Sequence, residues 1–151
     1  MPYLFEFTYH NPTQIVFGPN SFAKLGSLVP ADAKVLLLYG GGSIKGNGVY
    51  DQVMAALAGR EVVEFAGVEP NPTLETLSAA VDLAKRQKTD FILGVGGGSV
   101  SDGAKYIACA ALYDGDGWDI VCGRHAPREA LPVGIVLTLP ATGSESNPAA
   151  V

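Results

Sequence analysis

The stretch Leu93-Gly94-Val95-Gly96-Gly97-Gly98-Ser99-Val100-Ser101-Asp102 decides the fold. Residues 91–95 are an apolar run long enough for a buried parallel strand, glycines follow, and an amphipathic helical pattern begins at Ser99. A strand that turns through glycines into a helix leaves several backbone N–H groups without partners, at the positive end of the helix dipole. Such a place suits a phosphate, because glycine lets the anion approach the backbone closely.

A second interpretation of the same stretch is a tight strand-to-helix turn without a ligand. In that case Ser99 is the N-cap of the helix and Asp102 closes a capping box three residues later. The two interpretations are compatible. Three consecutive glycines exceed what a turn alone requires, so we favour a phosphate site.

The composition indicates one globular domain with a hydrophobic core. The chain has 151 residues, of which 48% are hydrophobic and 17% charged. The net charge of −5, without a Lys/Arg cluster, argues against a nucleic-acid partner or an anionic membrane surface. No apolar stretch has transmembrane length, and the first residues do not resemble a signal peptide.

The cysteines and histidines are too few for a disulfide framework or a three-histidine metal site. Cys109 and Cys122 could form at most one bridge, and Cys109 falls near the apolar face of a predicted helix. We therefore expect a free thiol in a reducing, cytoplasmic compartment. With only His10 and His125, the chain cannot by itself offer three histidine ligands.

The first thirty residues predict a β-hairpin followed by a short helix. Residues 5–9 and 14–18 have strand-like patterns on either side of a turn that contains Pro12. Asn20 or Ser21 could then cap a helix that ends at Pro30.

From Lys34 onward the chain repeats a strand, a polar or glycine-rich loop and a helix. The expected strands are 35–39, 62–65, 91–95 and 131–138, and the expected helices begin near Val49, at Thr73 and at Ser99. Residues 113–129 are predicted to be a surface loop. The alternation predicts an α/β fold with a doubly wound parallel sheet.

In such a sheet, ligands bind beyond the carboxyl ends of the strands. The loops 40–45, 67–72, 96–99 and 138–147 all follow strands, so we expect them to meet at that edge. This convergence is the main functional signal in the sequence.

The loop after the first strand favours NADP over NAD. Neither the G-x-G-x-x-G fingerprint after the first strand nor the P-loop is present. The later glycine loop would take the pyrophosphate and the loop 40–45 the adenosine ribose. That loop offers no carboxylate for the ribose hydroxyls until Asp51, but it has glycine N–H groups, the Ser43 hydroxyl and the Lys45 ammonium, which suit a 2′-phosphate. The alternative is a flexible turn with a solvated lysine.

Four ordered motifs, at 39–45, 69–72, 96–105 and 137–147, resemble the group III, "iron-containing" alcohol dehydrogenases. The resemblance is strongest to the NADP-dependent branch of aldehyde reductases and butanol dehydrogenases. It implies a Rossmann-like, dehydroquinate-synthase-like fold with an N-terminal cofactor domain, here residues 1–151, and a helical C-terminal domain.

The resemblance also implies roles for single residues. The pyrophosphate would lie against Gly97, Gly98 and Ser99, and Asn71 along the cofactor. Asp102 corresponds to an acid near the nicotinamide half, where hydrogen bonding to the ribose or the nicotinamide amide suits a carboxylate better than phosphate contact. The full candidate cofactor-binding set is Gly40, Gly41, Ser43, Lys45, Asn71, Gly97, Gly98, Ser99, Asp102, Thr138, Thr142, Ser144 and Asn147.

In the full-length enzyme the resemblance implies hydride transfer between NADP(H) and an aldehyde or alcohol. A divalent metal, iron or zinc, would polarise the carbonyl, held by one Asp and three His of the C-terminal domain. The chain ends at Val151, before that domain. We therefore expect residues 1–151 to be the cofactor-binding half of an enzyme that forms a homo-oligomer, a dimer, at full length. This half supplies no metal ligand and no obvious proton donor, its catalytic residues are not identified, and it should show no turnover alone.

Two alternatives remain open. A polyol dehydrogenase or a dehydroquinate-synthase-type enzyme of the same superfold would also bind a dinucleotide here. The chain could also be a stand-alone nucleotide-binding module without catalysis, which should be monomeric and expose no large apolar face.

Overall fold

The computed structural model describes residues 6–150 and contains a parallel sheet with the strand order β2-β1-β3-β4. The strands are β1 (Lys34–Tyr39), β2 (Glu61–Phe65), β3 (Phe91–Gly96) and β4 (Val133–Leu137). The two central strands are buried along almost their whole length, which explains their continuous apolar sequences. The four strands predicted from Lys34 onward and the α/β class are confirmed.

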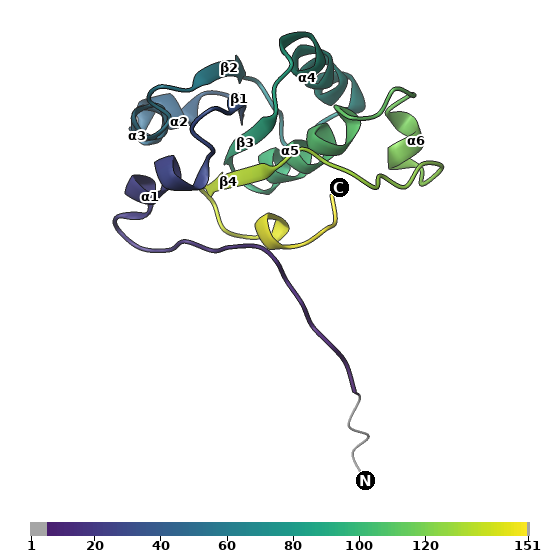
Figure 1. Cartoon of the computed structure of the whole chain (residues 1–151), viewed down its shortest axis with the longest axis horizontal. Helices are drawn as coiled ribbons and strands as arrows, with labels where there is room; N and C mark the ends of the chain where they lie inside the picture. Colours follow the sequence, from purple (N-terminus) through teal and green to yellow (C-terminus); the bar gives the residue numbers. More distant parts are fainter. Residues whose placement is uncertain (1–5, 151) are drawn as a thin grey trace.

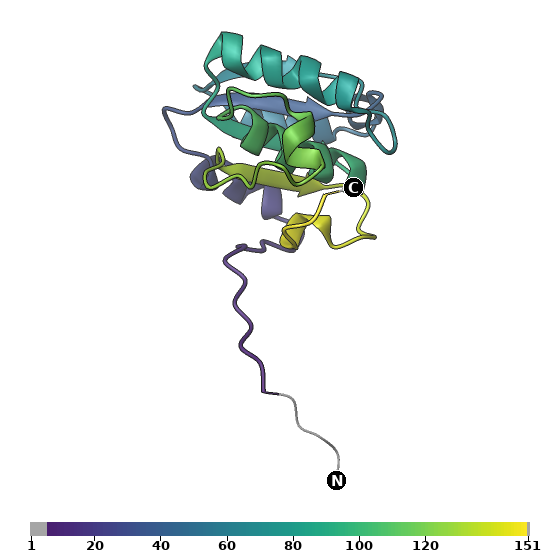
Figure 2. The same ribbon diagram turned by 90° about the vertical axis from the view of Figure 1, so that its right-hand side faces the viewer.

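Helices cover both faces of the sheet, so the molecule has three layers (Figures 1 and 2). On one face lie α1 (Ser21–Leu28), α2 (Ser43–Gly46) and α3 (Val49–Ala56), and on the other lie α4 (Leu74–Gln87) and α5 (Gly98–Ala110). Neighbouring strand residues serve opposite faces: Leu37 packs in the α1/α3 core and Leu36 in the α4/α5 core. The sheet is therefore doubly wound, as predicted.

The α4 helix has the ends that its sequence predicts. The Thr73 hydroxyl accepts a hydrogen bond from the Thr76 N–H at 3.3 Å, which caps the helix. Glu75 lies in the first turn and Lys85 and Arg86 in the last, as the helix dipole favours. Lys88 ends the helix in the left-handed region with φ 54°.

The predicted N-terminal hairpin is wrong within the described residues. Residues 6–17 form no strand: residues 6–10 project away from the domain as an arm, whereas Asn11 donates to the Ser146 carbonyl at 2.9 Å, so the following residues run alongside the 3-10 turn near the C-terminal end (Figures 1 and 2). Phe7 and Phe17 are 85% and 100% exposed, so neither finds an apolar partner in the domain. A two-stranded hairpin is only marginally stable without a further strand or a helix to pack against, which explains its absence here. The predicted first strand begins at Phe5, which lies outside the described residues.

The predicted N-cap of α5 is also wrong. The helix begins at Gly98 with Gly97 as its cap, so Ser99 lies inside the first turn and forms no capping box with Asp102. Both side chains are engaged by other loops instead, as described below.

Three short helical turns were not predicted: α2, α6 (Trp118–Val121) within the expected surface loop, and the 3-10 turn η1 (Ser144–Ser146). Each is four residues or fewer, which is too short to produce a periodic pattern. Cys109 and Cys122 are both free thiols, the first half-buried. None of the helices in residues 6–150 is long and apolar enough to cross a lipid bilayer.

Candidate functional site

The four predicted loops lie together at the carboxyl edge of the sheet. The Gly67 N–H donates to the Gly40 carbonyl at 3.1 Å, which joins the loops after β2 and β1. The Asn71 N–H donates to the Ser99 hydroxyl at 3.1 Å, which joins the β2 loop to the start of α5. The Thr138 N–H donates to the Gly96 carbonyl at 2.9 Å and so extends the contact between β4 and β3. The polar residues that sequence reasoning selected therefore share one edge.

The junction between β3 and α5 needs glycine for steric reasons. A Cβ atom on Gly96 would lie 2.6 Å from Val100 Cγ2, and one on Gly98 would lie 2.8 Å from Thr142 Oγ1. The Gly97 carbonyl accepts hydrogen bonds from both the N–H and the hydroxyl of Ser101, each at 3.1 Å, and Ser101 is fully buried. The first-turn N–H groups of α5 have no acceptor within the helix, so they remain available to an anion.

The loop after β2 is held rigidly against the start of α4. One oxygen of Glu69 accepts hydrogen bonds from the Thr73 N–H at 2.8 Å and from the Thr76 hydroxyl at 2.9 Å. The Thr73 N–H is the main reason why the pKa of the Glu69 carboxyl falls to about 2. Asn71 adopts a left-handed conformation with φ 53° and remains exposed beside Ser99.

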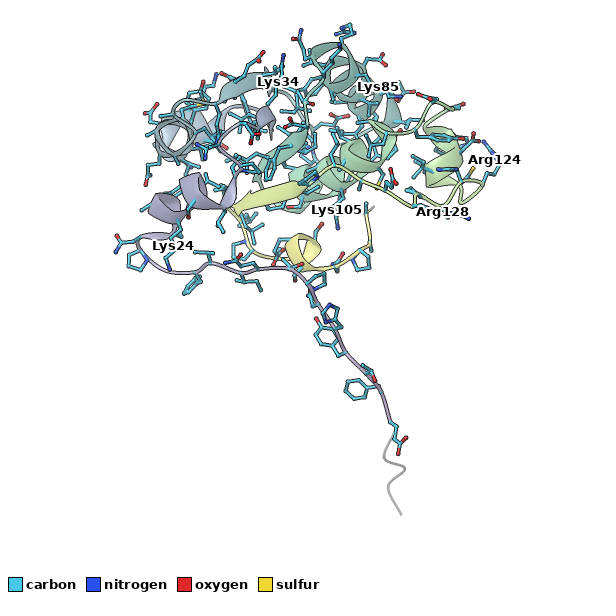
Figure 3. The ribbon with its side chains drawn as sticks, viewed as in Figure 1. Lys24, Lys34, Lys85, Lys105, Arg124 and Arg128 are labelled. Atoms are coloured by element: carbon cyan, nitrogen blue, oxygen red, sulfur yellow. The ribbon has the colours of Figure 1, made fainter. Side chains whose placement is uncertain are left out.

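The loop after β4 is tied to α5 by a polar network around Asp102. The buried Ser144 hydroxyl donates to Asp102 Oδ1, and Lys105 Nζ lies 3.4 Å from the same oxygen. Lys105, labelled in Figure 3, also donates to the side-chain and main-chain oxygens of Asn147, both at 3.2 Å. The Asp102 charge is therefore compensated by Lys105, and the segment 142–147 is positioned beside the start of α5.

The end of β1 carries a second cluster, which sequence reasoning identified only in part. Lys45 Nζ lies 3.5 Å from Glu64 Oε2 and 4.6 Å from the centre of the Tyr50 ring. The sequence offers no carboxylate in this loop before Asp51, but the pairing of β1 with β2 brings Glu64 beside it, which sequence reasoning missed. Glu64 is the only charged residue in the apolar run 62–65, and that interruption was the signal available in the sequence.

No group of three or more His, Cys, Asp or Glu side chains in residues 6–150 is arranged to hold a metal ion. His10 lies in the exposed arm, and His125 stacks on Tyr113 with 4.0 Å between the ring centres.

The sequence matches the family model "Iron-containing alcohol dehydrogenase" over residues 12–151. The chain belongs to the iron-containing alcohol dehydrogenase family. The resemblance inferred from the four motifs is confirmed.

The names of two similar relatives give different cofactors, NADPH for one and NADH for the other. The chain is 55% identical over 149 residues both to the NADPH-dependent aldehyde reductase YqhD of Escherichia coli and to the probable NADH-dependent butanol dehydrogenase 1 of Bacillus subtilis. In each case the match covers 97% of this chain and 38% of the relative. The chain thus spans about two fifths of the length of these curated relatives.

Solved structures of the family share the fold. The crystal structure of Escherichia coli YqhD matches with a TM-score of 0.90 and 54% identity, covering 94% of this chain and 37% of that one. Butanol dehydrogenase A of Thermotoga maritima matches with the same TM-score and 52% identity, over the same shares. The architecture of residues 6–150 is therefore that of the N-terminal part of these dehydrogenases.

Proposed function

We propose that this chain is the NADP(H)-binding part of an aldehyde reductase or alcohol dehydrogenase. The observation that carries the proposal is the start of α5, where the first-turn N–H groups adjoin the glycines 96–98, whose missing side chains leave the backbone open to an anion. A phosphate accepts hydrogen bonds from such groups without steric conflict. The names of the relatives, which are aldehyde reductases and butanol dehydrogenases, support the reaction class.

In this proposal the candidate residues would contact a dinucleotide along its whole length. Gly97, Gly98 and Ser99 would hold the pyrophosphate, with Asn71 beside Ser99. The loop after β4, with Thr138, Thr142, Ser144 and Asn147, would line the cofactor. The remaining candidates, Gly40, Gly41, Ser43 and Lys45, would surround the adenosine ribose and its 2′-phosphate.

When bound, the nicotinamide cofactor supplies or accepts the hydride. This chain's own residues bind and orient it. Asp102 is suited to hydrogen bonding with the ribose or the nicotinamide amide, because Lys105 compensates its charge at 3.4 Å and Ser144 fixes its orientation. A free carboxylate at this position would repel the pyrophosphate.

The metal that the family name implies does not fit the residues described here. Because residues 6–150 contain no cluster of three possible ligands, we assign no ligand and no step through a metal to this part of the chain. For the full-length enzyme we propose that iron or zinc polarises the carbonyl of an aldehyde substrate, or binds the corresponding alcohol, and that the enzyme is a dimer. We expect no reduction of butyraldehyde by this chain with added zinc or iron, and measurable turnover would contradict that part.

Direct titration tests the proposal. NADPH fluorescence should report saturable binding. Lys45→Gln should weaken NADPH binding about tenfold and change NADH binding little, because it removes the positive charge that would face the 2′-phosphate, which NADH lacks. Lys34→Gln is the matched control, since Lys34 pairs with Glu61 at the other end of β1 and β2 (Figure 3). Absence of NADPH binding to the wild-type chain, or equal loss in both variants, would contradict the proposal.

A further inference from the structure

Four side chains from four elements meet beside the proposed 2′-phosphate site. Tyr39 ends β1, Lys45 lies in α2, Tyr50 in α3 and Glu64 in β2. Both tyrosine hydroxyls donate to the Glu64 carboxylate, Tyr39 to Oε2 at 2.7 Å and Tyr50 to Oε1 at 2.6 Å. The two rings are 6.2 Å apart in an edge-to-face arrangement. The carboxylate is thus held in a fixed place by one donor on each oxygen.

The strand register explains why Glu64 reaches this corner. It pairs with Leu37 across the parallel ladder, and Tyr39 lies two residues further along on the same face of β1. The cluster therefore lies at the carboxyl edge, on the α2 and α3 side of the sheet (Figure 1).

Glu64 keeps its negative charge at neutral pH. The hydrogen bonds from Tyr50 and Tyr39 lower the pKa of its carboxyl group, and Lys45 lowers it further. The pKa of the Lys45 ammonium is raised, mainly by the Tyr39 hydroxyl and to a smaller extent by the negative charge of Glu64. Lys45 and Glu64 thus form an ion pair whose side chains are 50% and 34% exposed, so both remain accessible to a ligand.

This pair changes what a phosphate would meet at Lys45. An isolated ammonium attracts a phosphate dianion with its full charge, but here a carboxylate lies 3.5 Å from the same nitrogen. The carboxylate competes with the incoming phosphate for the lysine and also repels it. Salt screens this repulsion little, because a phosphate bound to Lys45 would lie closer to Glu64 than a Debye length of about 8 Å. The ribose hydroxyls of NADH carry no charge, so the carboxylate does not oppose them in this way.

We propose that Glu64, held in place by Tyr39 and Tyr50, limits the preference of this site for NADPH over NADH by competing with the 2′-phosphate for Lys45. The inference rests on the proposed function, because it presupposes that the dinucleotide binds at this edge. In this proposal Glu64 determines specificity by acting against the 2′-phosphate. Tyr39 and Tyr50 are positioning residues, because they act only by holding Glu64 in place.

Dissociation constants for NADPH and NADH, measured on the whole chain at one fixed salt concentration, test this proposal. Glu64→Gln should tighten NADPH about tenfold, equivalent to about 1.4 kcal/mol, and change NADH less than twofold. Glu61→Gln is the matched control: it removes the same charge from the same strand, at the far end where Glu61 pairs with Lys34. It should leave both constants unchanged.

A double-mutant cycle then tests the route through Lys45. In a Lys45→Gln background, Glu64→Gln should tighten NADPH much less than it does in the wild type. An equal effect in both backgrounds would overturn competition for the lysine, and an unchanged or lowered NADPH preference in the single variant would overturn the proposal itself. Thermal unfolding of each variant confirms that the chain remains folded. A wild-type chain that binds neither dinucleotide would instead overturn the proposed function, so the two failures are distinguishable.

Discussion

Replacing Gly98 with alanine should weaken NADPH binding far more than it destabilises the fold. The new Cβ would lie 2.8 Å from Thr142 Oγ1 and 3.2 Å from Thr142 Cγ2, so the threonine must move. Thr142 is exposed, and its movement costs about 1 kcal/mol, the low end of the range for overpacking. Alanine also recovers roughly 0.5–1 kcal/mol relative to glycine in a helix. The free energy of unfolding should therefore change by less than about 1 kcal/mol.

Binding should respond more strongly, because the methyl group and the displaced loop obstruct the first-turn N–H groups of α5. One lost hydrogen bond to a charged phosphate costs about 1.5–3 kcal/mol. Since each 1.4 kcal/mol is a factor of ten, the dissociation constant of NADPH should rise about ten- to a hundredfold.

The assay combines an NADPH fluorescence titration with urea unfolding of the same samples. Gly46→Ala is the matched control, because a Cβ there meets no atom within 4 Å. Adding Thr142→Ala to Gly98→Ala removes the clash and should restore stability without restoring full affinity. A Gly98→Ala chain that binds NADPH as tightly as the wild type would refute the argument that the phosphate lies at this junction.

Two further predictions concern the loops around the site. Ser144→Ala should lower the free energy of unfolding by about 1–3 kcal/mol, because it removes a buried donor to Asp102. Ser146→Ala is the control and should cost less, since that hydroxyl only reaches the Gly143 carbonyl at 3.4 Å. Equal losses of stability for the two variants in urea unfolding would contradict the role of Ser144. The Glu69 carboxyl has a pKa of about 2 in the folded chain against a usual 4.5, so its contribution to stability is present above pH 4.5 and lost as the pH falls toward 2. Glu69→Gln should flatten the pH dependence of thermal unfolding in that window, and an unchanged slope would contradict the hydrogen bond from the Thr73 N–H.

The strands and the larger helices could be predicted because their signals are local. The central strands are buried on both faces, so 35–39 and 91–95 appear in the sequence as unbroken apolar runs. The Thr73 cap is equally local, because donor and acceptor lie three residues apart. The convergence of loops followed from the rule that parallel strands place their carboxyl ends at one edge.

The errors come from interactions between distant residues. Serine is a common N-cap residue, which is why Ser99 was predicted to cap α5. Gly97 takes that position instead, and the Ser99 hydroxyl accepts a hydrogen bond from the Asn71 N–H, 28 residues away. The approach of Glu64 to Lys45 depends on the register between two strands and on a helical turn too short to predict. The predicted hairpin has a strand-like pattern of residues, but most of its large apolar side chains, Phe7, Tyr9, Ile15 and Phe17, find no cover within residues 6–150.

The most direct test of cofactor binding at this edge is an amide-resolved NMR titration of the chain with NADPH. If the dinucleotide binds at this edge, the largest shifts should fall on the amides of residues 40–45, 67–72, 96–99 and 138–147, and the start of α5 should show the largest of all. Shifts confined to the opposite edge of the sheet, or no shifts at saturating NADPH, would contradict it.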